Sequence, residues 1–427
     1  MAESRYDVIV VGAGIIGMAT AYHVLRTNPG KRILVVEKFA APGQGNTAKS
    51  AGAYRNVFSS NTNFLLADTS VNYFLDISDK GADVGLEKAG YLWLFTKEQY
   101  EKYKPIFEQM MQNGVELRFL NQDELKQILP DLCLKPDDEE AQMMGLGEIH
   151  IGVFGKKCGF IDADRLTRYY EQEFKKLGGE IRYNTEVKKL IVEPSEPLGV
   201  PWEPFIWQDV SVVGIGTSAG EIRADKIFVA TNAWAPQHLD PIGIDSLIKP
   251  QKHQMFVLRS EKMDRLMHPK GLSEKEILPF TILPKSVVYI RPDIHEGSFW
   301  VSAHGNLGHG LRFDEDPKAE NEFYDYNIYQ ILRKYLPVVD GVNLSNKWAG
   351  LYDMNSIYAN PYIFEKGGVI SVIGLSGSGI MKADAVGRIA AALYGGQEYA
   401  ELYGGKRFKV GDLGISERRV EKELFVL

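Results

Sequence analysis

Residues 6–37 read YDVIVVGAGIIGMATAYHVLRTNPGKRILVVE, and this stretch decides the fold. The apolar run 7–11 predicts a buried strand, residues 15–25 predict a helix, and residues 33–36 predict a second strand. Three glycines in G-x-G-x-x-G spacing join the first strand to the helix. This order predicts a β-α-β unit with two parallel strands.

The glycine turn has the chemistry of a dinucleotide-binding site. Gly12 permits a tight turn, Gly14 lets backbone N–H groups approach a pyrophosphate, and Gly17 lets helix and strand pack closely. The helix N-terminus directs the positive end of its dipole at the phosphates. Glu37, 20 residues beyond Gly17, can accept hydrogen bonds from ribose hydroxyls and repels a 2′-phosphate, so FAD or NAD is favoured over NADP. The expected contacts in this turn also include Ala13, Ile15 and Ile16.

Two other interpretations of the same stretch exist. Glycines recur wherever a helix crosses a strand and could serve packing alone, but here strand, helix and terminal acid fall in register. Residues 8–25 could also form a signal or membrane segment. Asp7 before them, three glycines within them and His23 near their end argue against that interpretation.

Length and composition narrow the class of protein. A chain of 427 residues predicts two interlocked domains, and a net charge of -7 disfavours nucleic-acid binding. The only two cysteines, Cys133 and Cys158, lack C-x-x-C spacing, so no zinc site or disulfide framework is expected. The first strand begins too early for a targeting peptide, and no run approaches the roughly 20 apolar residues of a membrane span. We expect a cytoplasmic protein.

The rest of the chain alternates between two kinds of segment. Further α/β material is expected at a helix 164–177, strands 180–183, 186–192, 210–215 and 222–230, a strand 369–373 and a helix 380–393. The intervening segments carry the β-type runs 91–95, 253–258, 287–291 and 299–303 and a helix 321–335. The chain therefore predicts an α/β cofactor domain formed by residues 1–85, 151–239 and 346–427. An antiparallel-sheet α+β substrate domain, residues 86–150 and 240–345, is inserted in it.

Three loops stand out between these elements. The acidic run 137–140 and the Pro-rich stretch 194–204 are predicted to be solvated loops. The third loop, residues 374–379, is glycine-rich and opens the last helix. Its backbone N–H groups and the helix dipole could stabilise negative charge on a bound ring, although an ordinary strand-to-helix turn has the same composition.

With these blocks in place, the chain resembles the D-amino-acid-oxidase superfamily of FAD-dependent oxidoreductases. The resemblance is to the branch with sarcosine and dimethylglycine oxidoreductases and glycine oxidase, and it covers nearly the whole length. It implies a glutathione-reductase-like, Rossmann-type FAD domain. Its anchors are the fingerprint with Glu37, the run NTAKSAGAYR at 46–55, ATNAWA at 230–235, WAGLYD at 348–353, and the loop 374–379 before AVGR at 385–388.

The resemblance implies roles for further residues. Arg55 would pair with a substrate carboxylate, for which its planar fork is suited; a surface cation is the alternative. Tyr289, His304 and Tyr352 would line the substrate cavity, or would be packed core aromatics and a core histidine. The implied FAD contacts beyond the fingerprint are Lys38, Thr47, Ser50, Ala51, Val187, Thr231, Asn232, Trp234, Gly350, Gly377, Ser378, Gly379, Ile380 and Met381.

The sequence departs from the family pattern in three places. No cysteine lies in residues 348–353, where some members attach the flavin, so non-covalent FAD is expected. Met381 stands where relatives have a carboxylate-binding lysine, so the neighbouring Lys382 is expected to point towards solvent or the helix surface, although it stays a candidate site residue. No lysine lies in residues 299–303, where members activate oxygen, which favours a dehydrogenase.

The activity implied is oxidation of a carbon–nitrogen bond in a small, secondary or N-methyl amino acid, with hydride transfer to flavin N5. His304 could assist weakly. A 2-hydroxy acid or glycerol 3-phosphate as substrate remains an alternative, and phosphate would call for several convergent cations, for which Arg55, Arg291 and Lys382 are the candidates. A non-catalytic, FAD-stabilised assembly factor is the other alternative, because fold does not fix function. The electron acceptor and the oligomeric state are left open.

Overall fold

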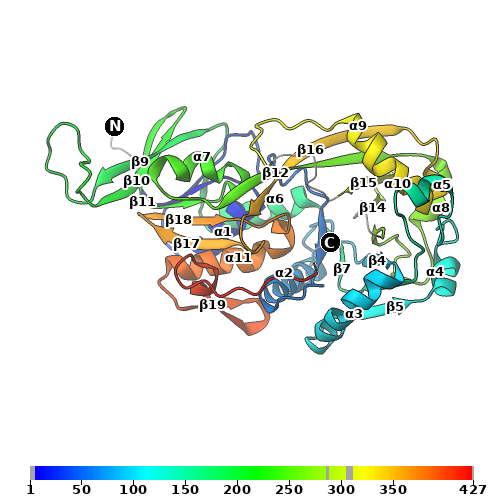
Figure 1. Cartoon of the computed structure of the whole chain (residues 1–427). Helices are drawn as coiled ribbons and strands as arrows, with labels where there is room; N and C mark the ends of the chain where they lie inside the picture. Colours follow the sequence, from blue (N-terminus) through cyan, green and yellow to red (C-terminus); the bar gives the residue numbers. More distant parts are fainter. Residues whose placement is uncertain (1–4, 285–287, 304–310, 426–427) are drawn as a thin grey trace.

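The computed structural model describes residues 5–284, 288–303 and 311–425. Two eight-stranded sheets organise these residues and lie towards opposite ends of the molecule (Figure 1). The first sheet has the order β17 (Tyr362–Lys366), β18 (Val369–Ile373), β11 (Gly220–Val229), β1 (Tyr6–Val11), β2 (Ile33–Val36) and β8 (Glu180–Arg182). In addition, β10 (Val210–Thr217) pairs with β11, and β9 (Val187–Pro194) pairs with β10. The strands from β18 to β8 run parallel, as predicted for the β-α-β unit.

The first sheet is covered on both faces. On one face of the sheet, Val8 and Val10 of β1 pack in a core shared with the long helices. On the other face, Ile9 and Val11 pack in a second core shared with β9, β10 and α7. This arrangement explains why β1 is continuously apolar. The helices of this part are α1 (Ile15–Thr27), α2 (Asn61–Asp79), α6 (Ala163–Lys176), α7 (Ala235–Leu239) and α11 (Gly379–Tyr394).

The second sheet is antiparallel except where β13 pairs with β4. Its order is β16 (Leu344–Asn355), β12 (Ile248–Leu258), β15 (Ser298–Ala303), β14 (Val288–Asp293), β13 (Phe280–Ile282), β4 (Tyr91–Phe95), β6 (Ile151–Gly155) and β5 (Leu117–Leu120). The accompanying helices are α3 (Lys97–Gln112), α4 (Gln122–Ile128), α5 (Glu139–Met143), α8 (Asp264–Met267), α9 (Asn321–Phe323) and α10 (Tyr329–Tyr335). The predicted α/β fold with a second, mostly antiparallel sheet is confirmed.

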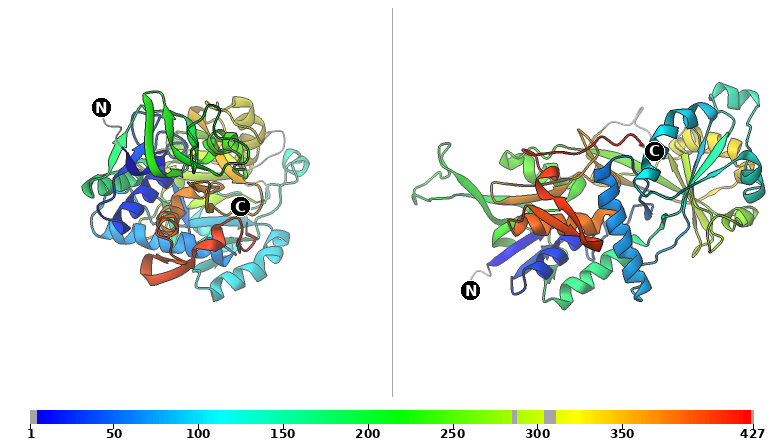
Figure 2. Two further views of the ribbon diagram at one scale, coloured as in Figure 1. Left: turned by 90° about the vertical axis from the view of Figure 1, so that its left-hand side faces the viewer. Right: turned by 90° about the horizontal axis from the view of Figure 1, so that it is seen from below.

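Two short ribbons complete the fold. β3 (Ala53–Arg55) pairs with β7 (Cys158–Phe160), and β19 (Tyr399–Leu402) pairs with β20 (Lys406–Lys409). After β20 the chain runs back along the molecule (Figures 1 and 2), and Phe425, the last described residue, packs against Trp93 of β4 and Phe107 of α3. No helix in the described ranges is both long and apolar enough to cross a membrane.

The predicted domain boundaries differ from the sheet pairing at two strands. β6 and β16, assigned by sequence to the cofactor domain, hydrogen-bond to β4 and β12 in the second sheet. Both strands begin close to a predicted domain boundary. The local sequence pattern predicts a strand but does not reveal with which other strand it pairs. The division into two domains itself stays a prediction.

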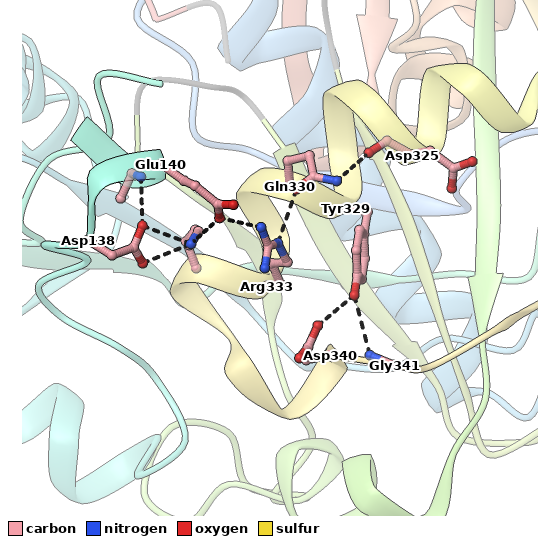
Figure 3. Close-up of polar contacts among 10 residues, drawn as sticks. Asp138, Glu140, Asp325, Tyr329, Gln330, Arg333, Asp340 and Gly341 are labelled. Carbon is pink, nitrogen blue, oxygen red and sulfur yellow. Dashed lines mark hydrogen bonds and ion pairs between the residues drawn. The ribbon is translucent and has the colours of Figure 1, made fainter. Parts of the chain in front are cut away.

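Two local predictions need correction. The expected helix 321–335 is interrupted by a π-helical turn at Tyr324–Ile328 between α9 and α10. The acidic run 137–140 is not simply a solvated loop, because Asp138 caps α5 and accepts from Lys334 Nζ of α10 at 2.8 Å. Glu140 forms an ion pair with Arg333 of α10, and Figure 3 shows the two side chains side by side. The Pro-rich stretch does lie in the exposed loop between β9 and β10.

Candidate active site

Two cavities share a wall made by Ser50, His253, Tyr352 and Gly377. The first, here called the cofactor cavity, extends from the glycine turn and Glu37 to the loop before α11. The second, here called the substrate cavity, lies between β3, the second sheet and α11. The predicted cofactor residues that line the cofactor cavity are Gly12, Gly14, Ile15, Glu37, Lys38, Thr47, Ser50, Val187, Thr231, Asn232, Trp234, Gly350, Gly377, Gly379 and Ile380.

The remaining predicted cofactor residues take other positions. Ala51, Ser378 and Met381 line the substrate cavity. Ile16 is buried in the helical core, where it supports the glycine turn. Ala13 contributes through its backbone, because its N–H donates to Glu37 Oε2 at 2.8 Å.

The glycines of the turn are required by close backbone contacts. Gly12 has φ +100°, a left-handed conformation that side chains disfavour, and a Cβ there would lie 3.0 Å from the Ala230 carbonyl oxygen. A Cβ on Gly17 would lie 1.9 Å from the carbonyl oxygen of Gly12, so α1 could not pack against β1. The fingerprint is therefore a steric requirement of this strand-to-helix crossing as well as a motif.

Glu37 directly follows the end of β2, and the residue is only 9% exposed. Besides Ala13 N–H, it accepts from Phe39 N–H, at 3.0 Å to Oε1. Each carboxylate oxygen has more than one acceptor position. The group is therefore fixed by the backbone and can still accept from a ligand hydroxyl in the cavity that it lines.

The segment 46–50 is held between the two sheets. Thr47 Oγ1 accepts from Ile15 N–H at 3.2 Å, and Asn46 Oδ1 accepts from Leu351 N–H at 2.9 Å. The indole N–H of Trp348 donates to the Lys49 carbonyl at 3.0 Å. These bonds tie the N-terminus of α1 to β16 and fix one wall of the cofactor cavity.

The glycine-rich loop is fixed by a buried acid. Asp353 on β16 accepts from the N–H groups of Gly374 and Leu375, at 2.9 and 2.8 Å to Oδ2. Burial raises the pKa of Asp353 to about 6, although these donors favour the ionised form. The loop leads into α11, whose first residues line the cofactor cavity together with the first residue of α1. Two helix N-termini thus face one cavity, which suits a ligand with phosphates and an electron-rich ring.

The residues present fit FAD by a further test. Asn46 Nδ2, Thr231 Oγ1 and Asn232 Oδ1 are buried polar atoms with no hydrogen-bond partner among the described residues. All three residues line the cofactor cavity. Buried polar groups are normally paired, so these atoms are free to bind a polar ligand there.

Arg55 lies in the substrate cavity, as the sequence predicted. Its side chain extends from β3 and is 9% exposed, with the guanidinium carbon 4.5 Å from the centroid of the Phe58 ring. The Nη1 atom is buried and has no hydrogen-bond partner in the described part of the chain. A buried guanidinium with an unused donor is a ready site for a carboxylate.

The expected orientation of Lys382 is wrong. The side chain is 1% exposed and lines the substrate cavity, where Nζ donates to Asn63 Oδ1 at 2.7 Å and lies 5.0 Å from the Phe58 ring centroid. Burial lowers the pKa of Lys382 to about 7, with Glu423 and Arg55 acting in opposite directions. The glycine loop does not reveal the rotational position of α11, which is set by packing on α1 and α2.

Aromatic side chains also line the substrate cavity. Tyr289 and Tyr352 line the substrate cavity as predicted, and His253 lies between them, with Nε2 2.8 Å from the Tyr289 hydroxyl and its ring stacked 4.5 Å from that of Tyr352. Burial raises the pKa of both tyrosines, so the phenols stay protonated and neutral at neutral pH. His304 lies outside the described residues.

Arg291, a further candidate cation, lies outside the substrate cavity. It lines a third cavity, donates to the carbonyl of Ala51, and is held between the rings of Phe160 and Trp300. Burial lowers its pKa to about 10. The guanidinium therefore supports the segment that leads to β3 and does not add to the charge of the substrate cavity.

Sequence reasoning missed several residues of the site. His238 and Glu315 line the cofactor cavity, and Glu315 accepts from the Trp234 indole at 2.8 Å. His253, Asn63 and Glu423 line the substrate cavity. The β-type run 253–258, which begins at His253, predicts a strand, but no local signal indicates Asn63 or Glu423.

Comparisons with known proteins agree with this arrangement. The family model described as DAO, FAD dependent oxidoreductase, matches residues 7–393. L-2-hydroxyglutarate dehydrogenase of Escherichia coli (strain K12) is 30% identical over 192 residues, 43% of this chain and 41% of that protein. The homologue of strain UMN026 is 29% identical over 272 residues, 62% and 56% of the two chains, so this chain spans about half the length of these relatives.

Other matches extend over nearly the whole chain. Monomeric sarcosine oxidase of Bacillus sp. (strain B-0618) is 21% identical over 403 residues, 92% of each chain. The crystal structure of L-proline dehydrogenase from P. horikoshii has a TM-score of 0.74 at 23% identity and covers 92% of this chain and 95% of that one, which shows the shared fold. The matching family model, the two-sheet fold and the glycine-lined cavity place this chain in the DAO family of FAD-dependent oxidoreductases.

Proposed function

We propose that this protein uses FAD to oxidise a carbon–nitrogen bond of a small amino acid whose nitrogen is secondary or N-methylated. One observation carries the proposal: the buried Arg55, with its unused Nη1 donor, lies in a cavity that shares a wall with the cofactor cavity. A carboxylate held by Arg55 would place the neighbouring C–N bond near the shared wall. The chain is similar to a sarcosine oxidase and to an L-proline dehydrogenase, and the substrates given in these two names are such molecules.

The chain's own residues bind, orient and exclude water. Bound FAD would supply the hydride acceptor, and Glu37, Thr47, the two helix N-termini and the glycine loop would hold it. Arg55 fixes one end of the substrate, and the aromatic side chains Tyr91, Tyr289 and Phe280 offer an apolar surface to an N-substituent. The amine need only be unprotonated when it reacts, so no general base is assigned.

A 2-hydroxy acid is the second candidate, because two relatives are named L-2-hydroxyglutarate dehydrogenase. Its carboxylate would bind Arg55 in the same way. Glycerol 3-phosphate suits the cavity less well: of the described residues that line it, the cations are Arg55 and Lys382, and Glu423 opposes their charge. A non-catalytic FAD-stabilised role is tested by the same experiment as the substrate.

We also propose that FAD is bound without a covalent link. Neither Cys133 nor Cys158 lines the cofactor cavity within the described chain. Acid precipitation should release all the flavin into the supernatant, and yellow colour retained in the pellet would refute this proposal.

The electron acceptor is a separate proposal. A dehydrogenase was favoured because residues 299–303 contain no lysine, and β15 has none. However, Lys49 lines the cofactor cavity and Lys382 the substrate cavity, so cations that could assist oxygen reduction are present nearby. The dehydrogenase assignment therefore depends on β15 alone. A rate with oxygen that equals the rate with a dye acceptor would overturn it.

The deciding experiment is a screen of purified, FAD-loaded protein with a dye acceptor. The panel contains sarcosine, dimethylglycine, proline, glycine, L-2-hydroxyglutarate and glycerol 3-phosphate. Turnover with one of the amines and none with the hydroxy compounds is expected. Turnover with a hydroxy compound alone would reassign the substrate, and no reduction by any panel member, even anaerobically, would count against an enzyme of this class.

A further inference from the structure

The C-terminal segment supplies one wall of the substrate cavity. Glu423, 6% exposed, accepts from the backbone N–H and hydroxyl of Ser59, at 2.7 and 2.6 Å, and from the hydroxyl of Ser60 at 3.1 Å. It also accepts from Asn63 Nδ2 at 3.0 Å. The carboxylate is thereby fixed at the start of α2 and lines the cavity in its ionised form, because these donors hold its pKa below the usual value in spite of burial.

Glu423 lines the same cavity as the two cations Arg55 and Lys382. Asn63 bridges it to Lys382, donating to Glu423 and accepting from Lys382 Nζ at 2.7 Å. Lys382 and Arg55 lie near the same Phe58 ring, at 5.0 and 4.5 Å from its centroid. With Lys382 charged, the described lining carries two cations and one anion; with Lys382 neutral, it carries one of each.

The two cations differ in what they can still bind. Lys382 already donates to Asn63, and its charge is partly offset by Glu423. Arg55 retains a buried donor without a described partner. One incoming carboxylate on Arg55 would satisfy that donor, whereas a second carboxylate on the same ligand would meet a region where Glu423 repels it.

We propose that Glu423 sets the charge specificity of the substrate cavity, so that the protein accepts substrates with a single carboxylate and rejects dicarboxylates. This inference rests on the proposed function and narrows it to monocarboxylic amino acids with an uncharged substituent. It also separates this chain from the dicarboxylate that names its L-2-hydroxyglutarate dehydrogenase relatives.

A purely structural role for Glu423 has a different signature. The carboxylate accepts from Ser59 and from Ser60, the N-cap residue of α2, so its loss would weaken the attachment of the C-terminal segment in either case. If Glu423 only attached the C-terminal segment and had no electrostatic influence on the ligand, its loss would change the affinities for monocarboxylates and dicarboxylates by the same factor. The ratio of the two affinities therefore reports specificity and is insensitive to a common loss of stability.

The experiment measures the dissociation constants of pentanoate and glutarate by their perturbation of the flavin spectrum in the FAD-loaded protein. These probes have the same number of carbons and differ in one carboxylate. Wild type should bind pentanoate about tenfold or more tightly than glutarate, and Glu423→Gln should reduce that ratio by about tenfold. The matched control is Glu421→Gln, because Glu421 accepts from Asn61 N–H at 2.5 Å at the same helix end but does not line the cavity. The control should keep the wild-type ratio.

Two further variants separate the possible failures. If Arg55→Met leaves both affinities unchanged, carboxylates do not bind at Arg55 and the proposed function falls. If Arg55→Met weakens both affinities while Glu423→Gln keeps the wild-type ratio, only the present inference is overturned. Should Glu423→Gln fail to fold, Lys382→Met decides the matter: it leaves Glu423 less neutralised and should widen the preference for pentanoate, and a narrower preference would contradict the inference.

Discussion

The cofactor cavity and the substrate cavity share a wall but are assembled in different ways. Most of the cofactor cavity comes from short runs of sequence, in which backbone N–H groups and glycines do the binding. The substrate cavity takes one or two side chains each from β3, α2, β4, β12, β13, β14, β16, α11 and the C-terminal segment. A site built from local backbone geometry can be predicted from sequence, whereas a site built from long-range packing cannot.

The largest expected effect concerns the packing of the C-terminal segment against the second sheet. Phe425 is fully buried, with ring centroids of Phe107 at 5.3 Å and Trp93 at 5.4 Å. Phe425→Ala should lower the free energy of unfolding by about 3–5 kcal/mol, because it leaves a cavity among aromatic rings. Chemical denaturation measures the change. Leu424→Ala, at a side chain 52% exposed, is the control and should be nearly neutral.

The second effect concerns the carboxylate anchor. Arg55→Met should lower kcat/KM for the monocarboxylic substrate by an amount equivalent to about 2–4 kcal/mol, because the substrate carboxylate would be buried without a partner. Arg55→Lys should also be harmful, since an ammonium keeps the charge but loses the two-point geometry. Arg118→Met, at an exposed arginine paired with Glu124, should leave kcat/KM unchanged. A silent Arg55→Met would show that substrate binds elsewhere.

The third effect tests the cofactor cavity. Glu37→Ala removes an acceptor for ribose hydroxyls together with the bonds from Ala13 and Phe39 N–H, and should weaken FAD binding by about 1.5–3 kcal/mol. Flavin retention during dialysis and the dissociation constant of reconstituted protein measure the loss. Glu365→Ala, in β17 of the same sheet, is the control. Equal FAD affinity in wild type and Glu37→Ala would mean that FAD does not use this end of the cavity.

The smallest effect is a pH dependence. Burial lowers the pKa of Lys382 to about 7, so its ammonium attracts a ligand carboxylate below that pH and the attraction is lost as the pH rises through it. The charged groups that act on Lys382 are Arg55, Glu423 and Asp353. Pentanoate affinity should therefore fall by up to about tenfold around pH 7 in wild type.

Lys382→Met should remove that step and leave a weaker one near pH 6, where Asp353 ionises. The contribution of Lys382 to the stability of the fold changes with pH in the opposite direction to the ligand affinity. The folded pKa of Lys382 lies below its ordinary value of 10.5, so the unfolded chain binds more protons between about pH 7 and 10.5 and stability should rise with pH in that window. An affinity step near pH 7 that persists in Lys382→Met would assign it to another group.

The elements that surround the cofactor cavity could be predicted from the sequence because their determinants are local, whereas the FAD contacts themselves stay a prediction. β18 has the predicted bounds, and α1, α11 and the glycine turn lie where the hydrophobic pattern placed them. Glu37 could be identified from its spacing after Gly17, and the structure adds that its carboxylate is held by the Ala13 and Phe39 N–H groups.

The errors have physical causes. Lys382 was expected at the surface because one residue of register turns a helix by about 100°, and only the packing of α11 on α1 and α2 fixes that angle. Glu423 lies 364 residues from Ser59, its hydrogen-bond partner, and no local pattern reports such a contact. The sequence places residues 151–239 and 346–427 in the cofactor domain, whereas β6 and β16 pair with strands of the second sheet; pairing between strands distant in sequence likewise leaves no local pattern.

Anaerobic reduction of the bound flavin tests the central claim most directly. The FAD-loaded protein is mixed without oxygen with proline or sarcosine in one cell and with L-2-hydroxyglutarate in another, and absorbance in the flavin band is followed. The account predicts that a monocarboxylic amine bleaches the flavin and that the dicarboxylic hydroxy acid does not. Bleaching by L-2-hydroxyglutarate alone would contradict both the assigned C–N chemistry and the charge specificity attributed to Glu423.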